Sequence, residues 1–160
     1  MRIFVPFVVD DLACVKLSPR LVHGVTRDLL QVFPGADQEG LEYVATMAAA
    51  DDSLRLLNRD GSLGFRRIVG VADVTNAMLA LPAADEQLLE TAVYLEQTLQ
   101  ISEFVSFLVD EPGNEALVRR AVAGDEVAFL NTEEIELLWY DAVERDALFR
   151  ELSASLDVHD

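Results

Sequence analysis

Apolar residues occur along the chain in short blocks that are separated by polar turns. Blocks rich in β-branched and aromatic residues predict strands, and apolar positions three or four apart predict helices. The predicted strands are 2–9, 65–74, 91–96, 104–109 and 137–140. The predicted helices are 18–33, 37–57, 114–122 and 142–152.

Local signals set several of the predicted boundaries. Ser18 followed by Pro19 is typical of a helix start, and Asp37 is a favoured cap for the next helix. Asp141 and Glu144 have the spacing of a capping box at the start of the last helix. Pro6 lacks an N–H group, so the first strand is expected to be an edge strand or to be bulged there.

Strands that alternate with helices predict an α/β or α+β fold with one mixed sheet of four to five strands. The order fits a ferredoxin-like βαββαβ core with one extra strand. We expect one domain over 1–160, with the first strand and two helices in 1–60 and the other strands and the C-terminal helices in 61–160.

The chain carries a strongly negative net charge. The formal net charge is −17, with 29 acidic residues against 12 lysines and arginines. Such a field repels phosphate backbones and attracts basic partners. We therefore expect no direct binding to nucleic acid, and a basic surface on any protein partner.

The single cysteine and the short apolar runs indicate the cellular compartment. Cys14 is the only cysteine, which excludes an internal disulfide and a cysteine-based zinc site, and its apolar neighbours predict a buried thiol. The apolar run 3–9 is too short for a signal peptide, and no stretch approaches the ~18 apolar residues that span a membrane. These features predict a cytoplasmic protein that does not enter a membrane.

Catalytic signatures are absent from the sequence. It has no P-loop, no dinucleotide-binding glycine pattern and no nucleophile elbow. His23 lies among apolar residues of a predicted helix, where a half-buried structural histidine is the more frequent case. The sequence leaves the question of an enzyme open and favours a protein without catalytic activity or cofactor.

Acidic residues follow most of the predicted strands. If the strands were parallel, Asp10, Asp73 and Asp141 would meet at one edge of the sheet and could hold Mg²⁺ or Mn²⁺. Helix capping explains the same positions without a metal. In a ferredoxin-like sheet, Asp10 and Asp73 would lie at one edge, with Asp110 and Asp141 at the other.

Three arginines surround a glycine-containing turn. Arg59, Arg66 and Arg67 lie on either side of residues 61–64 and could hold a phosphate or a carboxylate. The alternative is an ordinary loop whose arginines are solvated.

Four short segments resemble a known family. They are 1–6 (MRIFVP), 41–45 (LEYVA), 53–57 (SLRLL) and 137–141 (LLWYD). Together they resemble a family of small, acidic actinobacterial proteins classed as a domain of unknown function. The resemblance implies a single cytoplasmic domain and assigns no catalytic residue.

The first functional hypothesis is a non-enzymatic protein-binding or accessory module. Its candidate contact residues are Trp139, Tyr140 and Phe129, which would otherwise belong to the core. The alternatives are a Mg²⁺- or Mn²⁺-dependent enzyme for phosphoryl transfer or phosphoester hydrolysis, and an acidic nucleic-acid mimic. A homodimer through an exposed edge strand also stays open.

Overall fold

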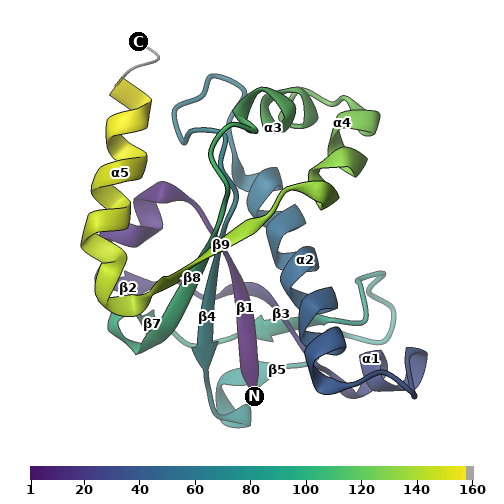
Figure 1. The fold of residues 1–160 in the computed structure, drawn as a ribbon. Coiled ribbons are helices and arrows are strands. Elements are labelled where there is room, and N and C mark those ends of the chain that lie inside the picture. The colour runs from purple at the N-terminus through teal and green to yellow at the C-terminus, as the bar shows by residue number, and fades with distance from the viewer. Residues whose placement is uncertain (158–160) are drawn as a thin grey trace.

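A computed structural model gives the fold and describes residues 1–157. At its centre is a seven-stranded sheet in the order β5-β6-β3-β1-β4-β8-β9, in which all neighbouring strands are antiparallel (Figure 1). β2 and β7 form a second, two-stranded sheet. The strands are β1 (Arg2–Phe7), β2 (Lys16–Leu17), β3 (Arg20–Gly24), β4 (Ile68–Asp73), β5 (Leu79–Ala80), β6 (Ala92–Leu95), β7 (Leu99–Gln100), β8 (Phe104–Asp110) and β9 (Leu137–Asp141).

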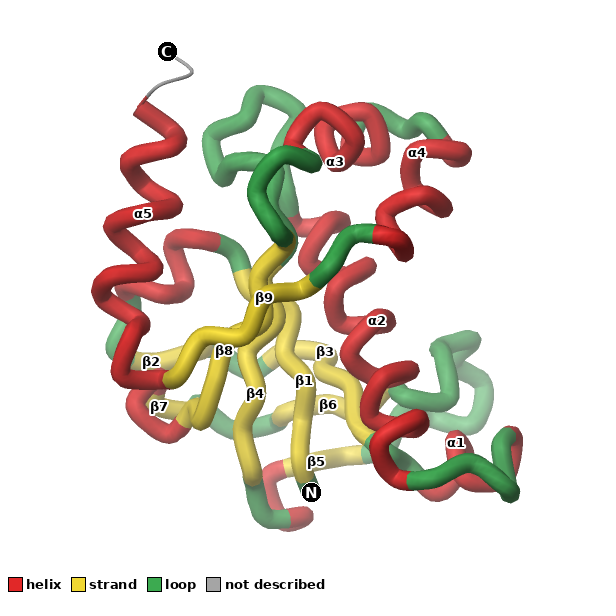
Figure 2. Tube along the Cα trace, viewed as in Figure 1, coloured by secondary structure: helices red, strands yellow, loops and turns green. Residues whose placement is uncertain are grey.

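Helices cover both faces of the large sheet (Figure 2). The α-helices are α1 (Arg27–Val32), α2 (Gln38–Leu56), α3 (Glu115–Val122), α4 (Glu126–Asn131) and α5 (Arg145–Asp157). The short 3-10 helices are η1 (Val9–Ala13), η2 (Asn76–Met78), η3 (Ile101–Glu103), η4 (Thr132–Glu134) and η5 (Ala142–Glu144). None of the helices within residues 1–157 has the length and apolar character that crossing a membrane requires.

The alternation of side chains along β1 divides the core between the two faces. Phe4 points toward α2, where Ala45 and Ala49 provide a flat surface that lies close to the sheet. Phe7 lies on the opposite face and packs edge-on against Phe104, with ring centroids 5.0 Å apart. That second face is closed by η1 and α5.

Pro6 lies in a central strand, yet its missing N–H leaves no bond unmade in the sheet. β1 pairs with β4 along its whole length, but with β3 only at Ile3 and Phe4. The Val74 amide donates to the carbonyl of Met1, and hydrogen-bonded pairs between β1 and β4 then occur at every second residue. Pro6 is not one of these residues, so its nitrogen faces the β3 side. The prediction of an edge or bulged strand is therefore wrong, because β1 lies between β3 and β4 without a bulge, but at Pro6 the pairing with β3 has already ended.

The helix predicted over 18–33 is wrong in its first half. Residues 20–24 form β3, which pairs with β1 on one side and β6 on the other. The helix begins only after Thr26, whose hydroxyl accepts a hydrogen bond from the Leu29 amide. Pairing with two distant strands outweighs the local start signal of Ser18 and Pro19.

The sheet itself is larger and more regular than the sequence predicted. It has seven antiparallel strands instead of four to five mixed ones. The ferredoxin-like core is not confirmed, since β1 and β4, which flank α2, are direct antiparallel neighbours with no strand between them. The additional strands of this sheet are β3 and the two-residue β5.

Several helix predictions are confirmed. α2 begins at the Asp37 cap, α3 follows Asn114, and Asp141 and Glu144 form the expected capping box. The acidic segment 124–136, where no helix was predicted, contains α4 and η4. Asp125 caps α4 through a hydrogen bond from the Ala128 amide.

Candidate functional site

The three aspartates proposed as metal ligands lie at two different ends of the sheet. Asp10 follows β1, whereas β4 and β9 both run opposite to β1 and carry Asp73 and Asp141 to the other end. The expected grouping is thereby corrected: Asp10 shares its end with Asp110, and Asp73 shares its end with Asp141.

Local partners account for two of these aspartates. Asp73 pairs with Arg2 at 3.0 Å, and Asp141 accepts a hydrogen bond from the Val143 amide. Within residues 1–157, no three His, Cys, Asp or Glu side chains gather closely enough to hold a metal ion. The structure therefore does not bring Asp10, Asp73 and Asp141 into one site.

Arg67 is fully buried and forms an ion pair with Asp110. Its Nη2 lies 2.9 Å from Asp110 Oδ1, and its Nε donates to the same carboxylate at 3.0 Å. Nη2 also donates to the carbonyl of Thr132, which ties β4, β8 and η4 together. Burial raises the pKa of Asp110, and the hydrogen bonds and charge of Arg67 oppose this change.

Arg66 points elsewhere, although it is the next residue. Its Nε donates to the carbonyl of Asp110, and its Nη1 lies 3.6 Å from Glu151 on α5. Arg66 and Arg59 line a cleft of about 670 Å³, whose lining does not include Arg67. The alternative of solvated loop arginines is wrong for Arg66 and Arg67, because both are buried.

His23 lies in a buried polar cluster rather than on a helix. Its Nδ1 is 2.8 Å from Thr91 Oγ1 on one side, and its Nε2 is 2.6 Å from Asp52 Oδ2 on the other. Burial acts to raise the pKa of Asp52, but hydrogen bonds from His23 and Arg55 outweigh it and lower this pKa. His23 and Thr91 are each 2% exposed and join β3 to α2, whereas the Asp52 side chain is 26% exposed and lines a surface pocket.

Cys14 is exposed, which makes the prediction of a buried thiol wrong. Its Sγ donates to the carbonyl of Asp10, 3.4 Å away, across the short helix η1. The buried side of η1 is provided by Val9 and Leu12 instead.

Within residues 1–157, β9 is the last strand of the sheet, and its outer side pairs with no other strand. Its central residue Trp139 is 62% exposed, whereas Tyr140 and Phe129 are half-buried. Trp139 stands opposite Leu108 of β8, on the face of the sheet that α2 partly covers. Of the three candidate contact residues, Trp139 is the one that the fold presents to solvent.

The register defines which backbone groups of β9 point outward. Glu111 donates to the carbonyl of Glu136, so these two residues form a hydrogen-bonded pair. Such pairs occur at every second residue of antiparallel strands, so the N–H and C=O groups of Leu138 and Tyr140 bond to β8. The N–H and C=O groups of Leu137 and Trp139 therefore face away from β8. The N–H of Asp141 also faces outward, but it donates to the Glu144 carboxylate at 2.8 Å.

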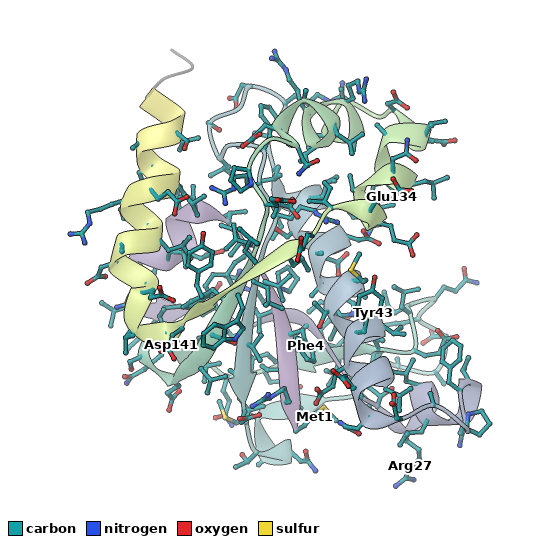
Figure 3. All side chains as sticks on the ribbon, in the orientation of Figure 1. Met1, Phe4, Arg27, Tyr43, Glu134 and Asp141 are labelled. Carbon is teal, nitrogen blue, oxygen red and sulfur yellow. The ribbon has the colours of Figure 1, made fainter. Side chains whose placement is uncertain are left out.

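The chain around β9 carries only negative charge. Residues 121–144 contain seven acidic residues and no lysine, arginine or histidine. Figure 3 shows Glu134 and Asp141 near opposite ends of β9. At the open edge of the sheet, the backbone groups of Leu137 and Trp139 face outward, the Trp139 side chain is exposed, and carboxylates flank the strand.

The comparisons with known proteins give one match. A family of unknown function, DUF6912, matches residues 1–149. No curated protein and no solved structure matches the chain.

Proposed function

We propose that this chain, which belongs to the DUF6912 family of unknown function, is a protein-binding module that takes up an extended basic segment along β9. The segment would add an eighth strand to the sheet. The observation that carries this proposal is the unpaired edge of β9 with Trp139 exposed on it.

An open strand edge supplies binding energy through backbone groups. The N–H and C=O groups of Leu137 and Trp139 are available to a partner strand, and such pairing is a recurrent mode of peptide recognition. Edge strands are commonly protected by charge, by shortness or by a covering loop. Asp141 ends β9 and Glu136 directly precedes it, but Leu138 and Trp139 in the middle of the strand are apolar.

Trp139 would provide the main side-chain contact. Tryptophan is enriched among the few residues that dominate binding energy at interfaces, because it buries a large apolar area with few rotatable bonds. It lies on the same face as Leu137 and Leu108, both of which are only partly buried. A partner residue that faces Trp139 can cover Trp139 and its diagonal neighbour Leu137, while Leu108 lies one strand farther away.

Charge complementarity favours a basic segment over a second copy of the chain as the partner of β9. A basic segment would be attracted by the carboxylates that flank β9, such as Glu136 and Asp141. A second copy of the chain would bring two molecules of net charge −17 together, with the acidic ends of β9 side by side. A basic partner is therefore the better occupant.

A defined peptide tests the proposal. The probe is KKVTVKK, whose valines can lie beside Trp139 and whose lysines reach the acidic ends of β9. We expect it to bind the protein measurably at low ionic strength, and we expect Trp139→Ala to weaken binding by about tenfold or more. Fluorescence anisotropy of the labelled peptide measures both affinities.

Two controls make the result specific. Val143→Ala removes another apolar side chain, 88% exposed, that lies just outside β9, and should leave the affinity unchanged. The acidic peptide EEVTVEE should not bind. The proposal is overturned if Trp139→Ala and Val143→Ala bind KKVTVKK equally, or if sedimentation shows a dimer that Trp139→Ala converts to a monomer.

A further inference from the structure

We propose that the cleft between the loop 58–65, α3 and α5 binds a small organic anion, whose phosphate or carboxylate group meets the arginines and whose apolar body lies against the leucines. The loop, α3 and the end of α5 come together at the top of the molecule in Figure 1. This surface is separate from β9 and rests on different residues.

The cleft has the size of a small-molecule site. Its volume of about 670 Å³ falls within the usual range for ligand pockets. The loop that forms one wall contains Gly61 and Gly64, whose φ angles of 76° and 73° favour glycine. Phe65 closes this wall, with its ring against Gly61.

Two of the arginines of the cleft form no ion pair with a described side chain. Arg59, Arg66 and Arg119 line it, and among the side chains of residues 1–156 the pair of Arg66 with Glu151, at 3.6 Å, is the only ion pair that these arginines make. The lining itself contains two acids, Asp60 and Glu115, which are turned to the backbone. Their carboxylates accept hydrogen bonds from amides, Asp60 from Ser62 and Glu115 from Gly113.

The cleft is rich in arginine for a strongly acidic molecule. The formal net charge of the chain is −17, yet three arginines and two acids line this one concave surface. Arg119 lies over the ring of Phe65, 5.8 Å from its centroid, which orients the guanidinium beside the cleft wall. An anion is the ligand that such an arrangement would attract.

Arg66 shows where the anionic group would lie. Its side chain is only 7% exposed, and its Nη2 has no hydrogen-bond partner among the described side chains and backbone of residues 1–156. Buried guanidinium donors are normally satisfied, so this nitrogen lacks an acceptor. The neighbouring Glu151 is 48% exposed and can move aside, which would let a ligand oxygen approach Arg66.

The remaining wall is apolar and defines the rest of the ligand. Leu63, Leu152 and Leu156 line the cleft from the loop and from α5. Leu63 and Leu156 are partly buried hydrophobic residues at the border of the core. An inorganic anion would leave this surface wet, whereas an apolar body would cover it.

Calorimetric titration with three probes tests the site. Phenyl phosphate and hexanoate carry an apolar body with different anionic groups, and inorganic phosphate carries none. We expect one or both organic anions to bind more tightly than inorganic phosphate. Arg59→Gln and Arg119→Gln should each weaken the binding about tenfold, the effect of losing one charged hydrogen bond.

The control is Arg120→Gln, because Arg120 is the neighbour of Arg119 on α3, is exposed and does not line the cleft. Its affinity should equal that of the unchanged protein, and all three variants should keep the melting temperature. The proposal is overturned if neither organic anion binds at about 1 mM. It is also overturned if Arg120→Gln weakens binding as much as Arg119→Gln.

Discussion

At the scale of single residues, the largest difference between sequence and structure concerns Arg66 and Arg67. Their place beside a glycine turn suggested exposed side chains, but both are buried. Asp110, the partner of Arg67, is 43 residues away, and Glu151 lies on the last helix. Partners so distant in sequence leave no local pattern, so burial of these arginines could not be predicted.

The buried pair gives a sharp prediction for stability. Asp110→Ala leaves the Arg67 guanidinium buried without its carboxylate, and it should lower the free energy of unfolding by about 3–5 kcal/mol. Asp73→Ala breaks the exposed pair with Arg2 and should cost about 1 kcal/mol or less. Urea denaturation at neutral pH measures both. Equal losses for the two variants would contradict the structural role of Asp110.

At the scale of elements, two local cap signals were confirmed, whereas the local start signal at Ser18 and Pro19 was overridden by strand pairing. The caps at Asp37 and Asp141 are interactions within a few residues, and both are present. β3 owes its conformation to pairing with β1 and β6, which a sequence pattern does not contain. For the same reason the sequence left open whether Trp139 is a contact residue or a core residue, since 137–140 is continuously apolar and does not reveal which strand is last.

The register of β9 can be tested with two prolines. The N–H of Leu138 faces β8, so Leu138→Pro removes a hydrogen bond of the sheet, leaves a carbonyl of β8 unsatisfied and should destabilise the protein by about 1–3 kcal/mol. The N–H of Trp139 faces outward, so Trp139→Pro should cost much less. Thermal unfolding compares the two variants. A larger loss for Trp139→Pro would mean that the open edge is assigned to the wrong residues.

At the scale of the whole molecule, the net charge and its location along the chain can be determined from the sequence alone. The net charge of −17 and the absence of basic residues over 121–144 are visible before any fold is known. The structure adds the location: this segment includes the outermost strand of the sheet. The same fold gathers Arg59, Arg66 and Arg119 in one cleft, which the sequence signals only in part, because Arg119 is far from the loop.

The proposed function depends most directly on the backbone amides of β9. In the free protein, the outward amides of Leu137 and Trp139 should exchange rapidly with solvent, while Leu138 and Tyr140 are protected by β8. Residue-resolved hydrogen exchange measured by NMR, without and with KKVTVKK, tests this expectation. The account predicts that the peptide slows exchange at Leu137 and Trp139 by about tenfold or more. Unchanged exchange at both amides while the peptide is bound would contradict it.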